Sequence, residues 1–167
     1  MTHSQKKLAP LAAIVLLACS ISAAAVPIVR QAKPAADSPT ALVKELYRVH
    51  NNGKGPVLAG KNRAVLQKFF DKKLADLLWK ILTTKSDEVG PLDFDPLFNA
   101  QDTEISNFLI SAAVGNDQES TVTVTFRNGD SAETIKFRLH HTEIGWRVAN
   151  IVYADGSDLI KILSSPQ

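Results

Sequence analysis

The chain changes its hydrophobic repeat after residue 103, and this change constrains the fold more than any other feature of the sequence. Upstream, apolar residues recur at the spacing of amphipathic helices. Downstream, apolar and polar residues alternate, which is the period of strands with one buried face. The alternating segments cover residues 108–114, 122–126, 135–141 and 144–152. Turn residues separate them, so we expect an α+β fold in which N-terminal helices pack on a curved, antiparallel four-stranded meander.

The helices are expected at three places before the strands. Ser38-Pro39 is typical of a helix start, because serine caps helices and proline suits the first helical position. Two further helices are expected over residues 65–70 and 74–82, with Asp71 as the cap of the second. After the strands, residues 159–163 are predicted to form either a short helix or an edge strand.

The N-terminus has the organisation of a secretory signal. Lys6 and Lys7 form a basic region, an apolar run covers residues 8–21, and small residues fill positions 22–25. We therefore expect residues 1–25 to direct export to the periplasm. The alternative is an uncleaved membrane anchor, since residues 8–29 carry no charge and are long enough to span a bilayer.

The rest of the chain is expected to contain one domain. Residues 26–39, with Pro34 and several alanines, resemble a tether. Residues 40–165 are expected to form a single α+β domain, in which a curved sheet wrapped over helices leaves a cone with one open end.

Cys19 is the only cysteine. The run Leu16-Leu17-Ala18-Cys19 resembles a lipobox, in which Cys19 would be lipidated, whereas Ala23-Ala24-Ala25 is typical of a general signal-peptidase site. Both schemes stay open. Either one leaves a domain without a thiol, which excludes cysteine catalysis and cysteine-ligated metals in it. Membrane contact is expected only through Cys19 lipidation or an uncleaved signal.

Charge argues against a nucleic-acid partner. The chain has 19 Lys and Arg against 17 Asp and Glu, so loss of Lys6 and Lys7 leaves 17 of each and a neutral domain. Residues 26–80 hold 11 basic and 4 acidic side chains, and residues 81–167 hold 6 and 13. The two halves are expected to pack on each other. Alternatively, a basic helical face with Lys68, Lys72 and Lys73 binds an envelope protein, as in an immunity-type subunit.

The acidic loop over residues 86–103 is the first candidate site. Asp93, Asp95, Gln101 and Asp102 offer oxygen ligands for a hard cation such as calcium, but their spacing matches no EF-hand. We expect a structural role instead, in which Asp95 caps a turn starting at Pro96 while Gln101 and Asp102 bond to the backbone. No metal site is predicted.

The open end of the cone is the second candidate site. Tyr47 and His50 on the first helix, with His141 and Asn150 on neighbouring strands, are expected to line a pocket for a small ligand. The alternative is a small enzyme of the isomerase or hydrolase type that uses His141 and Tyr47. The inward strand positions carry no carboxylate to orient a histidine, which favours binding over catalysis. The sequence has no phosphate-binding loop, and no cofactor is expected.

Two segments carry a resemblance to a known family: Leu92-Asp93-Phe94-Asp95-Pro96-Leu97-Phe98-Asn99-Ala100-Gln101-Asp102 and Gly145-Trp146-Arg147-Val148-Ala149-Asn150-Ile151-Val152-Tyr153. With the order of elements, they resemble the nuclear transport factor 2-like (cystatin-like cone) superfamily, and within it an uncharacterised bacterial group of exported domains that includes the YbjP-type envelope lipoproteins. The resemblance implies a cone fold in the bacterial envelope, and it brings no enzymatic activity with it. We therefore expect a non-enzymatic exported binding module whose partner is a small ligand or an envelope protein.

Overall fold

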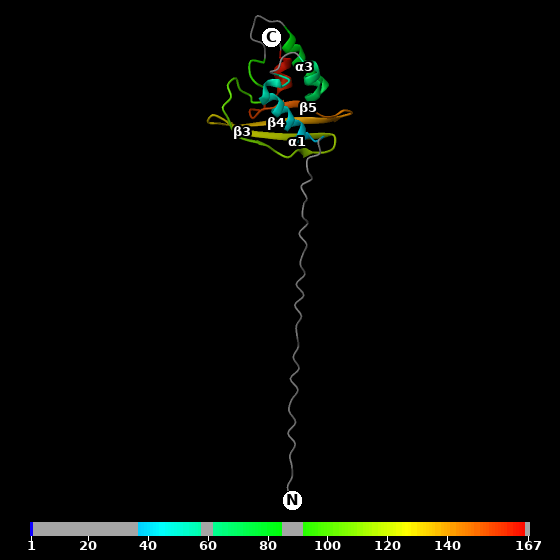
Figure 1. Cartoon of the computed structure of the whole chain (residues 1–167), viewed down its shortest axis with the longest axis vertical. Helices are drawn as coiled ribbons and strands as arrows, with labels where there is room; N and C mark the ends of the chain where they lie inside the picture. Colours follow the sequence, from blue (N-terminus) through cyan, green and yellow to red (C-terminus); the bar gives the residue numbers. More distant parts are fainter. Residues whose placement is uncertain (2–36, 58–61, 85–91, 166–167) are drawn as a thin grey trace. The chain divides into compact units, whose positions relative to one another are not determined.

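The computed structural model describes Met1 and residues 37–57, 62–84 and 92–165 (Figure 1). The predicted signal (apart from Met1), Cys19 and most of the tether lie outside these residues. Every described residue from Asp37 onward belongs to one compact unit. Within the described ranges, no helix combines the length and apolarity needed to cross a membrane. The elements in chain order are α1 (Pro39–Val49), η1 (His50–Lys54), α2 (Arg63–Phe69), α3 (Lys72–Thr83), β1 (Ile105–Ile110), β2 (Val114–Gly115), β3 (Glu119–Asn128), β4 (Ser131–Thr142), β5 (Gly145–Val152) and α4 (Leu159–Ser164).

The helices begin where their capping residues stand. Ser38 precedes α1, and its hydroxyl accepts a hydrogen bond from the Ala41 amide at 3.2 Å. Asp71 precedes α3, and its carboxylate accepts from the Leu74 amide at 2.8 Å. Each cap satisfies an amide that the first helical turn leaves free. Both predicted helix starts are confirmed, and the segment left open after the strands is the helix α4.

The strands form one antiparallel sheet in the order β1-β3-β4-β5, with the short β2 also paired to β3. The α+β class is therefore confirmed, but the sheet has five strands instead of four. The first predicted strand is divided into β1 and β2. Ser111 lies between them, and its side-chain oxygen accepts a hydrogen bond from the Thr123 amide at 3.0 Å. A side chain thus takes the place of a backbone acceptor, and the regular ladder stops there.

β5 contains a bulge that the alternating pattern does not predict. In the register with β4, Val148 and Asn150 have partners and Ala149 has none. The extra residue shifts the phase of the strand, so that Val148 and Ile151 are both fully buried. The expectation that residues 144–152 alternate throughout is therefore wrong, and Asn150 is directed away from the inward series.

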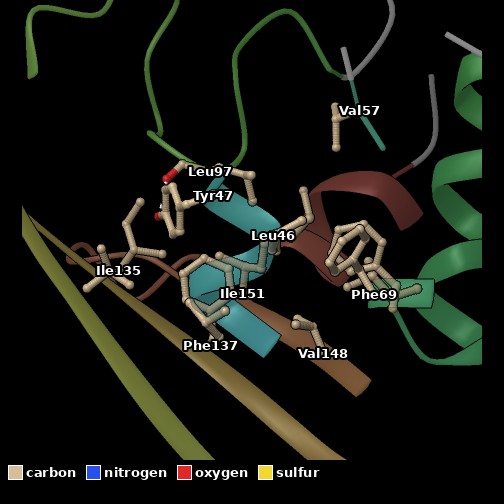
Figure 2. Packing of buried hydrophobic residues seen from close by; sticks show 14 of the residues in the cluster. Leu46, Tyr47, Val57, Phe69, Leu97, Ile135, Phe137, Val148 and Ile151 are labelled. Carbon is tan, nitrogen blue, oxygen red and sulfur yellow. Dashed lines mark hydrogen bonds between the residues drawn. The ribbon is translucent and has the colours of Figure 1, made fainter. Parts of the chain in front are cut away.

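The core lies between the helices and one face of the sheet. Buried residues of α1 and α3 belong to one hydrophobic cluster with those of β3, β4 and β5, and Figure 1 shows α1 crossing these strands. In Figure 2, Leu46 of α1 lies close to Phe137 and Ile151 of the sheet, and all three are fully buried. Each such side chain stabilises the fold by about 1.5–3 kcal/mol. This layer fixes the end of α1 against the start of β1, where the candidate site lies.

Candidate functional site

A cavity of about 620 Å³ opens where the end of α1, the loop before β1 and β1 itself meet. Three segments line it: His50 and Asn51 after α1, Asp95, Phe98 and Thr103 in the loop, and Ile105 and Phe108 on β1. Its size is that of a small-molecule site. Of the residues predicted to line a pocket, His50 does so.

His50 and Asp95 form the polar floor of this cavity. His50 Nε2 lies 2.6 Å from Asp95 Oδ2, and the His50 side chain is buried. The other carboxylate oxygen of Asp95 accepts a hydrogen bond from the Leu97 amide at 2.9 Å. The carboxylate therefore joins the end of the first helix to a turn of the loop, and each of its oxygens has a partner.

The second ring nitrogen of His50 faces the backbone of Gly55. His50 Nδ1 is buried and has no hydrogen-bond partner among the described residues. A Cβ atom placed on Gly55 would lie 2.8 Å from it and 2.7 Å from His50 Cα. Glycine is therefore required for this close approach. With Nε2 held by Asp95 and Nδ1 packed against Gly55, neither nitrogen is presented to a ligand.

The acidic loop is held both by its own hydrogen bonds and by bonds from neighbouring elements. The Asp95 amide donates to the Ala100 carbonyl at 2.8 Å. Gln101 donates to the Asp93 carboxylate at 3.4 Å, and the Asp102 carbonyl accepts from the Asn128 side chain at 3.0 Å. Gln101 thus contacts a side chain where a backbone bond was expected. Across the ranges that the structure describes, no three His, Cys, Asp or Glu side chains gather as metal ligands.

Two tyrosine hydroxyls donate hydrogen bonds to backbone carbonyls of the same loop. Tyr47 donates to the Leu97 carbonyl at 2.6 Å, and Figure 2 shows its ring pointing toward Leu97. Tyr153 donates to the Pro96 carbonyl at 3.2 Å. Burial, with a smaller contribution from the nearby Asp95 carboxylate, raises the pKa of both phenols well above the usual range. Tyr47 therefore holds the loop beside the cavity but does not line the cavity, and its phenol keeps its proton.

An aromatic cluster forms the apolar wall. The Tyr47 ring centroid lies 4.9 Å from that of Phe108 and 5.5 Å from that of Phe98, both in edge-to-face arrangements. Phe108 also stacks on Phe126 at 6.2 Å. Phe108 nevertheless keeps 39% of its surface exposed at the rim of the cavity. Phe108 was not among the residues predicted to line the pocket, although its place in the alternating segment 108–114 is a signal that could have marked it.

The two predicted pocket residues on the strands lie elsewhere. His141, at the end of β4, is exposed and packs its ring edge-to-face against Trp146 at 5.1 Å. Asn150 donates to the Asp158 carboxylate at 3.1 Å and accepts from the Ile160 amide at 3.2 Å, so it fastens the start of α4 to β5. Neither residue lines the cavity that His50 and Asp95 share.

Comparison with protein-family models and with curated proteins finds no match for the chain. The chain is similar to a phospholipid-binding protein from Ralstonia solanacearum whose structure was solved in complex with a phospholipid. The two are 17% identical, the match covers 74% of this chain and 82% of that one, and the TM-score is 0.43. A likeness of this strength assigns neither a fold family nor a function to the chain.

Proposed function

We propose that this chain is a non-enzymatic binding module that holds a small, partly apolar ligand in the cavity above His50 and Asp95. The exposed ring of Phe108 carries the proposal. A phenylalanine within an aromatic cluster is normally covered, and here 39% of it faces the cavity and solvent. Asn51 and Thr103, which also line the cavity, offer polar groups. An apolar wall with a few polar groups is the usual composition of a ligand site.

The side chains considered as general acids or bases are either held by other protein groups or lie outside the cavity, which supports binding over catalysis. A general acid or base must reach the proton that it transfers. His50 is held between Asp95 and Gly55, and the Tyr47 hydroxyl is donated to a backbone carbonyl. His141 lies outside the cavity. A hydrolase or isomerase that uses Tyr47 and His141 would need these two side chains at one site.

The proposal includes export. The basic, apolar and small-residue order of residues 1–25 supports delivery to the periplasm, with Cys19 either removed or lipidated. The antiparallel sheet on helices supports the finer assignment to the nuclear transport factor 2-like cone, and the segments over residues 92–102 and 145–153 support the assignment to the YbjP-type group. Mass spectrometry of the intact protein tests cleavage and lipidation, and cell fractionation tests export: recovery of the chain in the cytoplasmic fraction would contradict export.

Occlusion of the cavity tests the binding function. Thr103 is exposed and lines the cavity, so Thr103→Trp fills the cavity without removing a core side chain. Asp102→Trp places the same bulk at an exposed neighbour that does not line it. Nile red fluorescence reports occupancy by an apolar probe, and native mass spectrometry reports co-purified molecules. We expect Thr103→Trp to lose both signals and Asp102→Trp to keep them. Equal binding by the two variants would overturn the proposal.

A further inference from the structure

The face of the sheet that points away from the helices carries a row of cations. Every second residue of a strand points to the same face of the sheet, so Lys136 and Arg138 of β4 lie on one face. In register with them on β3 stand Thr123 and Thr121. Ile135, Phe137 and Leu139, which alternate with these cations along β4, belong to the core shared with the helices, so the cations point away from the helices. We call the surface formed by Lys136, Arg138, Thr123 and Thr121 the outer sheet face. Both cations on it are exposed.

The positive charge of this face is not neutralised within the described part of the chain. Lys136 and Arg138 form no ion pair with a described carboxylate, whereas cations of the helices do. Lys72 lies 2.6 Å from Asp76, and Lys68 lies 3.7 Å from Glu45. Glu119, at one end of the outer sheet face, is 3.6 Å from His140. Of the basic helical residues predicted to bind a partner, Lys68 and Lys72 are therefore paired, whereas Lys73 has no ion pair among the described residues, like Lys136 and Arg138.

Exposed aliphatic side chains border the cations. Leu109 stands opposite Thr125 and Val114 opposite Thr121, so both project from the same side as the cations. Leu109 is 63% exposed and Val114 is 76% exposed. Beside Val114, a recess of about 570 Å³ is lined by Thr121, Arg138 and His140, and also by the acidic residue Glu119. This recess is large enough for a phosphate-bearing headgroup.

The residue composition of this face distinguishes between two anionic partners, an acidic protein and an anionic bilayer surface. Protein interfaces draw most of their binding energy from aromatic and arginine anchors in desolvated pockets. The aromatic rings of β3 and β4, Phe126 and Phe137, are both buried in the core. Spread cations with hydroxyls and a few protruding aliphatic groups suit a diffuse anionic surface, in which each cation near the surface contributes separately.

We propose that the outer sheet face docks on a bilayer surface that carries anionic headgroups. Lys136 and Arg138 attract the phosphates, and the hydroxyls of Thr121 and Thr123 donate hydrogen bonds to them. Leu109 and Val114 enter the interfacial layer. This contact is additional to any attachment through the N-terminal segment, and it leaves the cavity above His50 and Asp95 free.

Vesicle co-sedimentation of matched charge-reversal variants tests this docking. The protein is used as purified after export, with the same N-terminus in every variant, so that attachment through that end contributes equally. Lys136→Glu with Arg138→Glu changes the outer sheet face. Lys73→Glu with Lys80→Glu gives the same net charge on exposed positions of α3. The vesicles are phosphatidylcholine alone, or phosphatidylcholine with about one third phosphatidylglycerol.

We expect the sheet variant to bind the anionic vesicles at least roughly thirty-fold more weakly than the wild type, because each cation near such a surface contributes about a factor of five. The α3 variant should bind nearly as well as the wild type, and neutral vesicles should bind neither. Equal losses in the two variants would overturn the proposal. Salt-sensitive binding to polyglutamate, without binding to vesicles, would also overturn it and indicate an acidic protein partner.

Discussion

His50 Nε2 lies 2.6 Å from Asp95 Oδ2, and this contact joins the end of α1 to the loop that precedes β1. The same carboxylate also accepts from the Leu97 amide. The loop carries Phe98 and Thr103, so the pair determines where one wall of the cavity lies. Its removal should affect both stability and ligand binding.

Asp95→Ala should lower the free energy of unfolding by about 2–3 kcal/mol, because it leaves the buried His50 ring and the Leu97 amide without an acceptor. Urea denaturation measures this. Asp93→Ala is the control, since it removes an exposed carboxylate with one long hydrogen bond and should cost less than about 0.5 kcal/mol. Equal unfolding midpoints for the two variants would show that the pair contributes nothing.

The two tyrosines that clamp the loop should differ in strength. Tyr47→Phe removes a 2.6 Å bond and should cost about 1–2 kcal/mol, because the Leu97 carbonyl is left without its donor. Tyr153→Phe removes a 3.2 Å bond and should cost less. Chemical denaturation of both variants at neutral pH ranks them. The reverse order would contradict the geometry.

The raised pKa of Tyr47 predicts a loss of stability in alkali. Burial favours the neutral phenol in the folded state, so its contribution is complete below the unfolded pKa of about 10. As the pH rises above that value, the unfolded chain releases this proton first, and folding weakens. Between about pH 9 and pH 11, Tyr47→Phe should therefore lose less stability than the wild type, as urea midpoints would report. Parallel pH curves would exclude this linkage.

The sequence predicted the elements better than their contacts. Residues 135–139 alternate because one face of β4 is buried, and Ser38 and Asp71 cap the helices that follow them. Such signals are local, so the printed chain contains them. The bulge at Ala149 is different, because it depends on how β5 pairs with β4 and not on the pattern of β5 itself.

The site shows the same division between local and long-range signals. His50 directly follows α1 and continues its apolar stripe, which predicted its place near the cavity. Its partner Asp95 is 45 residues away in an irregular loop, and no spacing rule connects the two. The inward strand positions carry no carboxylate, because the one that bonds to His50 comes from the loop. Asn150 was assigned to the pocket by an alternation that the bulge interrupts.

Asn150→Asp isolates the contact between β5 and the start of α4. The new carboxylate would still accept from the Ile160 amide, but its second oxygen would face the Asp158 carboxylate where Asn150 now donates at 3.1 Å. At pH 7 the variant should lose about 1–3 kcal/mol, since a hydrogen bond to a charged group is replaced by repulsion.

The deficit of Asn150→Asp should shrink in acid. Partial burial of Asp158 opposes its ionisation, but hydrogen bonds from Asn150 and Lys161 outweigh it, so the pKa of Asp158 is lowered in the wild type. The stability from that carboxylate is present above its unfolded pKa of about 4 and is lost as the pH falls through the folded value. The variant carries adjacent carboxylates whose mutual repulsion disappears on protonation. Urea denaturation from about pH 7 to pH 4 should therefore bring the two proteins together. A gap that stays constant over this range would place the cost of the substitution elsewhere than in the contact with Asp158.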